Sequence, residues 1–434
     1  MTETLLLGTA KVNITPSFPV PLAGFASRQG MGAFEGVSHP LYARVFCLQH
    51  RGGNGETTSA AIISADLLWW GNQMIAELKR RIREIWPADE IILHATHTHS
   101  GPQVWDGFSR YGGAFDPLYV EELSVKVTEG IDVAIRNMEG VYAEHGLGEC
   151  EIAMNRRQRA EGQVQIGMNP TGPADRELTV IRYRNYAGRV KGVLVHYACH
   201  PVVTMENSVS SEFTGVAMET LEQAIGGGGA VCAYLQGTCG DINPCERGGG
   251  DATVVKLGRQ LASDVQRVLD APMKRLSASA LLSRAWQIEL PLQAMPERAY
   301  LESLQSNPGA MGEWSGKLLA GFDSLKNYLP LSVTTLRLAE GIALLAMNAE
   351  VVTEYGLFLK SLSEGRVLPL GYCDGMIGYI TTAQQLVEGG YEPIGSTIYF
   401  GMPAPFHSTA EQTLRDAMLR MVNDIYVPDT NTGS

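Results

Sequence analysis

The sequence has 434 residues, of which 45% are hydrophobic and 18% are charged, so the chain can bury a large core and lacks the composition of a disordered polymer. The formal net charge is −12, and acidic and basic residues are interspersed, which argues against nucleic acid or an anionic lipid surface as a partner. No segment approaches the roughly 18 apolar residues of a membrane span, and the N-terminus lacks the basic and apolar segments of a signal peptide.

The cysteines point to a reducing compartment. There are seven of them, an odd number, and no Cys-x-x-Cys pair occurs. This pattern favours reduced packing residues over a disulfide framework. Together with the N-terminal sequence, it predicts a cytoplasmic protein.

Short β-rich runs alternate with helical patterns along the chain. The buried run A-A-I-I-S-A at 60–65 predicts a strand, and apolar positions spaced by three and four predict a helix over 74–86. Further strands are expected at 90–94, 177–183, 192–197, 230–235, 341–347, 366–371 and 378–382, and further helices at 119–138, from 211, at 254–269, at 351–362 and, irregularly, within 297–329.

This alternation predicts an α/β fold in which a mixed β-sheet core is flanked by helices. No segment with the composition of a linker interrupts the pattern. We therefore expect one domain over 1–425, followed by a loose tail over 426–434.

Three of the nine histidines lie in the segment L-H-A-T-H-T-H-S-G-P, which follows an expected strand. His97 and His99 are two residues apart, so on an extended backbone their side chains lie on one face and can bind a metal together. A lone H-x-H pair is also common without a metal. His94 is out of phase with that face, and a packing or capping role is expected for it.

Two other strand ends carry groups that can bind a metal. His200 follows the strand at 192–197, although a buried histidine satisfied by backbone groups fits its position equally well. Glu350 follows the apolar strand at 341–347 and needs a cation or several donors if it is buried, but it could also cap the next helix. Nitrogen and oxygen donors gathered in this way, with one position left for water, suit a catalytic zinc.

Other catalytic motifs are absent. The sequence has no G-x-S-x-G, no G-x-x-x-x-G-K-[ST], no H-E-x-x-H and no G-x-G-x-x-G. Cys239 is a single loop cysteine, which is usually not a nucleophile. The sequence alone assigns no role to Asp66 or Cys239.

Taken in order, separate segments of the chain resemble the catalytic, N-terminal domain of the neutral/alkaline non-lysosomal ceramidase family. The most specific is A-T-H-T-H-S-G-P at 95–102, followed by G-Y-I-T-T at 378–382 with G-G-Y-E-P at 389–393. The others are G-T-A-K-V-N-I-T-P at 8–16, G-F-A-S-R at 24–28, I-S-A-D-L at 63–67, M-N-R-R at 154–157, H-Y-A-C-H-P at 196–201, S-E-F-T-G-V-A at 211–217, G-T-C-G-D-I-N-P at 237–244 and N-A-E-V-V-T-E-Y-G at 348–356.

The resemblance implies a single zinc ion and its ligands. By motif, these are His97, His200, Glu350 and Tyr379. It also implies a fold like the ceramidase catalytic domain, here without the C-terminal immunoglobulin-like domain of ceramidases.

The resemblance further implies three catalytic residues. His99 would donate to the substrate carbonyl or its oxyanion and could protonate the leaving amine. Arg156 corresponds to the active-site arginine of the family, and Tyr391 to a tyrosine that faces the substrate.

The leading hypothesis is therefore a zinc-dependent hydrolase of the neutral ceramidase type, which cleaves an N-acyl amide bond with a metal-activated water. The same zinc site acting on an ester, lactone or glycosidic bond is the alternative among enzymes, and a non-catalytic binding protein is the alternative of another class. The expected partner is a small or lipid-like amide, and the oligomeric state is not indicated.

Two features depart from the family pattern. Asn243 stands where the family loop has a serine, so a serine nucleophile is excluded there, whereas Asp241 is kept and is expected to order the loop. The secretion signal and the additional domain of ceramidases have no counterpart in the sequence. Ceramide and a smaller soluble amide thus remain alternative substrates.

Overall fold

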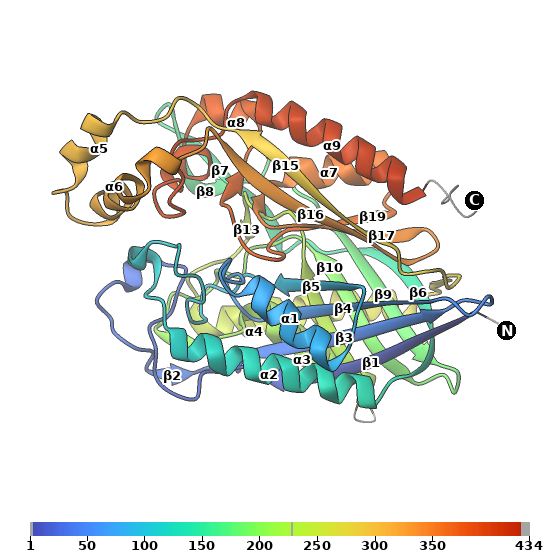
Figure 1. The fold of residues 1–434 in the computed structure, drawn as a ribbon. Helices are drawn as coiled ribbons and strands as arrows, with labels where there is room; N and C mark the ends of the chain where they lie inside the picture. Colours follow the sequence, from blue (N-terminus) through green and yellow to red (C-terminus); the bar gives the residue numbers. More distant parts are fainter. Residues whose placement is uncertain (1–2, 227–228, 427–434) are drawn as a thin grey trace.

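The computed structural model describes residues 3–226 and 229–426, which form four layers (Figure 1). Helices cover the outer face of a large sheet, a second sheet packs on the inner face of the large one, and further helices cover the second sheet (Figure 1). This α/β arrangement with a mixed sheet confirms the predicted fold class.

The large sheet has nine strands. Its order is β12-β10-β9-β6-β1-β3-β4-β5, with β14 paired to β6. Neighbouring strands are antiparallel except for the pairs β4–β5 and β10–β12 at the two ends, which are parallel. The bounds are β1 (Thr4–Asn13), β3 (Tyr42–Arg51), β4 (Thr57–Ala65), β5 (Glu90–Ala95), β6 (Glu139–Glu149), β9 (Glu177–Asn185), β10 (Val190–Tyr197), β12 (Val231–Gln236) and β14 (Lys274–Arg275).

The second sheet has the order β15-β16-β17-β19, with β15 (Ser283–Pro291), β16 (Tyr328–Ala339), β17 (Ile342–Met347) and β19 (Val367–Leu370). Only β17 and β19 are parallel. There are also smaller sheets in the described residues: β18 (Glu350–Val351) with β20 (Tyr379–Ile380), β7 (Ala153–Ala160) with β8 (Gln163–Asn169) and β13 (Ile242–Pro244), and β2 (Gly36–Val37) with β11 (Ser208–Val209).

Side chains that alternate along the strands build the core between the two sheets. On the large sheet, Phe46 and Ile62 face inward, and on the second sheet Leu344 faces them in the same apolar cluster. The residues one step along, such as Ile63 and Leu345, belong to the cluster under the helices. The period of two follows from the pleat of a strand, so each sheet is buried on both faces.

Helices complete the outer layers (Figure 1). The large sheet is covered by α1 (Ile75–Ile85), α2 (Pro117–Arg136), α3 (Glu212–Ile225) and α4 (Gly250–Asp270), and the second sheet by α7 (Thr353–Ser363) and α9 (Thr409–Tyr426). Three further helices are α5 (Arg298–Leu304), α6 (Ala310–Ala320) and α8 (Ala383–Glu388), of which α5 and α6 lie at one end of the molecule (Figure 1). In the described part of the chain, no helix combines the length and the hydrophobicity needed to cross a bilayer.

Every predicted helix and strand is present, with shifts of a few residues at the ends. The stretch over 297–329 is only partly helical, because β16 begins at Tyr328 after α5 and α6. The helix expected from residue 351 begins at Thr353, since the two preceding residues form β18. Residues 427–434, which make up nearly all of the expected tail, lie outside the described residues, and Tyr426 is the last residue of α9.

Candidate metal centre

The ends of strands β5 and β10 bring His97 and His200 together. The chain leaves β5 at Ala95, and His97 adopts a left-handed backbone conformation with φ of 71°, so the extended geometry expected for the H-x-H pair is wrong. The rings of His97 and His200 nevertheless lie edge to face, with their centroids 4.7 Å apart. Strained conformations of this kind are typical of functional sites.

Backbone carbonyl groups orient both rings. Nδ1 of His97 lies 2.8 Å from the Leu68 carbonyl oxygen, and Nδ1 of His200 lies 2.6 Å from that of Cys239. A nitrogen that faces a carbonyl oxygen must carry the proton, which leaves Nε2 of each ring unprotonated, with a lone pair that can accept a hydrogen bond or bind a metal. Burial lowers the pKa of both side chains well below the usual value for histidine, so both are neutral and suited to bind a metal.

His99 joins the same cluster from the side. Its Nε2 lies 3.1 Å from Nε2 of His97, and its Nδ1 lies 2.9 Å from the Gly24 carbonyl oxygen. The three histidines at 97, 99 and 200 each offer a ring nitrogen within 4.8 Å of the others. His99 is the most exposed of the three.

Glu350 supplies the negative charge of the cluster. Its Oε2 lies 3.5 Å from Nε2 of His97 and 3.4 Å from Nε2 of His200. The side chain is buried, and this oxygen has no hydrogen-bond partner. Burial raises the pKa of Glu350, and the nearby His97 opposes that rise. A buried carboxylate oxygen beside two lone-pair nitrogens is costly unless a cation lies between them.

The pairing of β18 with β20 places Tyr379 beside Glu350. Nη2 of Arg156 donates to the Tyr379 hydroxyl at 2.9 Å, and Nη1 lies 3.3 Å from Nε2 of His200. Tyr391, in the π-helical turn η4 (Tyr391–Gly395), packs edge to face on Tyr379 with ring centroids 5.7 Å apart.

All seven side chains predicted for the site therefore lie in one cluster. The donor set, with imidazole nitrogens and one carboxylate, suits zinc, and the unpartnered Glu350 oxygen fits a cation. His99 is as close to His97 as a fellow ligand would be, so the three histidines could also bind a metal by themselves. The division into ligands and catalytic residues stays a prediction.

Other residues hold this arrangement and were not predicted. Glu392 accepts from Nε of Arg156 at 2.8 Å and from Nη1 of Arg157 at 2.6 Å. The only signal for it was its place next to Tyr391 in the G-G-Y-E-P segment. Asn243 accepts from Nη1 of Arg156 at 3.3 Å, which fixes the third side of the guanidinium group.

Asp241 orders the loop, as expected. One carboxylate oxygen accepts from the Thr353 amide at 2.8 Å, and the other accepts from Gln385 and Asn155. Asp66 pairs with Arg44 at 3.0 Å inside the large sheet. Both aspartates are therefore structural.

The remaining polar candidates of the segment and the loop are also structural. His94 is buried, with Nδ1 3.1 Å from the Ser64 hydroxyl and Nε2 accepting from the Gln236 amide at 2.8 Å. This bond links the edge strands β5 and β12 and confirms the expected packing role. Burial raises the pKa of the Cys239 thiol well above its usual value, which argues against a nucleophilic thiolate.

Comparison with known proteins agrees with these features. The sequence profile described as neutral/alkaline non-lysosomal ceramidase, N-terminal, matches residues 5–253. The chain is 22% identical over 337 residues to the neutral ceramidases of Drosophila melanogaster and Drosophila pseudoobscura pseudoobscura, in alignments that cover 66% of this chain and 46% of each relative. The chain thus spans about half the length of these curated relatives.

Solved structures show the same fold. The crystal structure of neutral ceramidase from Pseudomonas aeruginosa superposes with a TM-score of 0.73 at 17% identity, over 100% of this chain and 77% of that one. A ceramidase complexed with C2 gives a TM-score of 0.73 at 15% identity, over 99% of this chain and 77% of that one. Because the matching profile covers more than half of the sequence, the chain belongs to the neutral/alkaline non-lysosomal ceramidase family.

Proposed function

We propose that this chain is a zinc-dependent hydrolase that cleaves an N-acyl amide bond with water. The observation that carries the proposal is the buried Glu350 Oε2, which has no hydrogen-bond partner and faces Nε2 of both His97 and His200. With Tyr379 from the paired strand, these residues would hold the metal. When bound, zinc lowers the pKa of a water to about 7 and polarises the scissile carbonyl.

His99 moves the proton in this proposal. The Gly24 carbonyl keeps a proton on Nδ1, and burial lowers the pKa of the side chain well below the usual value, so the neutral ring presents the lone pair of Nε2. This nitrogen can accept the proton of the attacking water and then donate it to the leaving amine. The amide and water thereby give a carboxylate and an amine. The sequence had suggested only that His99 donates a proton. Because its tautomer leaves Nε2 unprotonated, His99 can first accept one.

Arg156 stabilises the developing charge. Its guanidinium group is buried and fixed by Glu392, Tyr379 and Asn243, so it needs no reorganisation when an oxyanion forms nearby. A donor preorganised in this way typically contributes about 3 kcal/mol to the transition state. Tyr391 is partly exposed beside Tyr379 and is assigned to contact with the substrate.

The relatives suggest the class of substrate. The proteins that match are named neutral ceramidases, which points to an N-acyl amide. Because the alignments cover only 46% of the curated relatives, ceramide itself and a smaller soluble amide are both candidate substrates to be compared directly.

Metal content and turnover of single variants test the proposal. His97→Ala is expected to lose zinc, measured by elemental analysis after dialysis, and to lose activity with it. His99→Ala is expected to keep zinc and to lower kcat on a fluorogenic N-acyl-sphingosine or on short N-acyl amides by about 100-fold or more, since it removes the proton acceptor.

His94→Gln, which lies in the same segment and points away from the cluster, serves as the control and should keep both zinc and turnover. Full zinc occupancy in His97→Ala would contradict the ligand set. Zinc loss in His99→Ala would make His99 a ligand. Wild-type protein without zinc and without sensitivity to chelators would contradict the proposed function altogether.

A further inference from the structure

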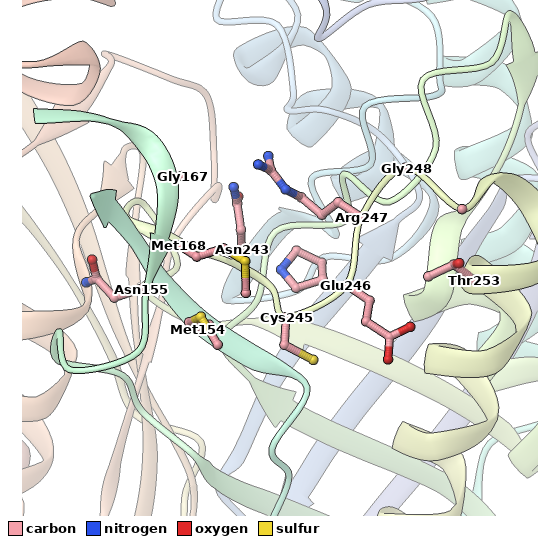
Figure 2. A pocket seen from close by; sticks show the side chains of 12 residues that line it. Met154, Asn155, Gly167, Met168, Asn243, Cys245, Glu246, Arg247, Gly248 and Thr253 are labelled. Carbon is pink, nitrogen blue, oxygen red and sulfur yellow. The ribbon is translucent and has the colours of Figure 1, made fainter. Parts of the chain in front are cut away.

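A cavity of about 550 Å³ lies between β7, β8 and the segment that leads from β13 to α4 (Figure 2). One wall is formed by β7 and β8, with Met154 and Met168, and the other by the segment between β13 and the start of α4 (Figure 2). Polar and apolar groups share these walls, so the cavity can hold a short aliphatic segment together with a polar or charged group.

Two side chains separate this cavity from the centre. Asn243 lines the cavity, and its Oδ1 accepts from Nη1 of Arg156 at 3.3 Å. The same Nη1 lies 3.3 Å from Nε2 of His200. The cavity is thus separated from the candidate ligand His200 only by the hydrogen-bonded side chains of Asn243 and Arg156.

The cavity carries an uncompensated positive charge. Arg247 lines it, and within residues 3–226 and 229–426 no carboxylate forms an ion pair with this side chain. Partial burial, and after it the charge of Arg156, lower the pKa of Arg247, so the two cations lie near enough to repel each other. Glu246 also lines the cavity, but its carboxylate is paired with Lys256 at 2.5 Å.

An anion in the cavity would relieve this repulsion. A guanidinium group binds a carboxylate or a phosphate through two parallel hydrogen bonds. The methionines at 154 and 168 offer apolar contact for the carbon atoms next to such a group. Ceramide is neutral and has no group that would use Arg247.

We propose that this cavity binds an anionic group of the substrate, with Arg247 as its partner, so that the preferred substrate is an N-acyl amide that carries a carboxylate or a phosphate. This inference rests on the proposed hydrolase function for the position of the reacting amide. Arg247 then determines specificity and takes no part in bond cleavage. The products are a carboxylate and an amine, one of which keeps the anionic group.

Matched amides test the inference. N-hexanoylglycine carries a carboxylate, N-hexanoyl-O-phosphoethanolamine carries a phosphate, and N-hexanoylglycinamide is the neutral counterpart of the first. The zinc-loaded wild type should hydrolyse an anionic amide with a kcat/KM about 10- to 100-fold above that of the neutral one, mostly through KM, because a hydrogen bond to a charged group is lost in the neutral compound.

Arg247→Gln should remove this preference and leave hydrolysis of N-hexanoylglycinamide unchanged, and Arg247→Lys should restore part of it. Arg259→Gln, an exposed change further along α4, is the matched control and should behave as wild type. A higher kcat/KM for the phosphate compound or for the carboxylate compound shows which of the two anions the cavity prefers. Equal kcat/KM values for anionic and neutral amides in the wild type, or equal losses on both in Arg247→Gln, would overturn the inference.

Calorimetric titration of the zinc-loaded protein separates this inference from the proposed function. Wild type should bind at least one anionic amide about 10-fold or more tightly than the neutral one, and Arg247→Gln should not. The titration tests the anion site without turnover. If the wild type binds an anionic amide more tightly but hydrolyses none of the amides, only the hydrolase function is contradicted. If the wild type binds anionic and neutral amides equally, only the anion site is contradicted.

Discussion

Arg156 is held in place by a carboxylate that serves two arginines. Glu392 accepts from Nε of Arg156 and from Nη1 of Arg157, and all three side chains are buried. Burial by itself would raise the pKa of Glu392, but the charges of the two arginines outweigh it and lower the pKa. Glu392 is thus ionised, and it fixes the direction in which Arg156 presents its remaining N–H groups.

Glu392→Gln should therefore reduce kcat on an N-acyl amide while it leaves KM and zinc content nearly unchanged. We expect a loss of about 10- to 100-fold, because one donor that is fixed in the transition state contributes about 3 kcal/mol at most. Steady-state kinetics and elemental analysis measure both effects. The glutamine side chain keeps one oxygen that can accept a hydrogen bond from an arginine. Measurement of Tm serves as the control that the variant is folded.

The matched control is Glu388→Gln. This glutamate pairs with Arg157 and Arg159 and has no bond to Arg156, so its loss should leave kcat within about twofold of the wild type. Equal losses of kcat in both variants would contradict a specific positioning role for Glu392.

At the scale of elements, helix α3 begins with a buried carboxyl group. Glu212, its first residue, has a left-handed backbone with φ of 59° and is fully buried. Its carboxyl group accepts from the Thr204 amide at 2.9 Å. Burial raises its pKa to about 7, although backbone donors and the charge of Arg28 oppose the rise.

This shift makes the stability of the protein depend on pH. The folded state keeps the Glu212 proton up to about pH 7, whereas the unfolded chain releases it near its ordinary value of about 4.3. The free energy of unfolding should therefore fall as pH rises from 5 to 8, by up to about 3 kcal/mol from this group. Urea unfolding at the two pH values measures it.

Glu212→Gln removes this contribution, so its free energy of unfolding should fall less over the same range than that of the wild type. The comparison isolates Glu212 from Asp241, whose pKa burial raises to about 6. The same pH dependence in both proteins would show that Glu212 is not the group responsible.

Local sequence patterns predicted only some strands of each sheet: β1, β3 and β6 of the large sheet were missed, as were β15 and β16 of the second. Continuous apolar runs such as those of β4 and β17 can be recognised because both faces of the strand are covered. In β15 and β16, polar residues alternate with apolar ones, and this weaker period of two was overlooked beside the helical stretch that precedes β16. The packing between the two sheets was therefore foreseen only in part.

The site could be predicted only in part, because local patterns do not show which distant segments meet in the fold. The H-x-H pair at 97 and 99 is a local signal, but spacing alone does not show that the loops with His200, Glu350 and Tyr379 meet there. The family resemblance supplied that set. Glu392 and Arg247 act through contacts between distant segments, which a single sequence does not reveal.

At the scale of the whole molecule, the candidate ligands come from both sheets. His97 and His200 follow β5 and β10 of the large sheet, whereas Glu350 and Tyr379 follow β17 and β19 of the second. A metal bound by all four would therefore join the two sheets at one end of their shared core. Binding to the folded state alone also stabilises that state.

Removal of zinc should thus lower Tm. At a zinc concentration about 1,000-fold above Kd, the ligand contributes about 4 kcal/mol, which corresponds to a shift in Tm of about 4 °C in a chain of this size. Differential scanning calorimetry with and without a chelator measures the shift. His97→Ala, which lacks a ligand, should show no shift on chelation, and an equal shift in both proteins would contradict the site.

The distribution of these residues along the chain also has a consequence for biosynthesis. The segment that matches the family profile, 5–253, contains all three clustered histidines but neither Glu350 nor Tyr379. A nascent chain emerging from the ribosome thus exposes its imidazoles well before the carboxylate that completes the centre. If the metal is held as proposed, its full set of ligands is therefore assembled only after residues as far as Tyr379 have been synthesised and have joined the fold.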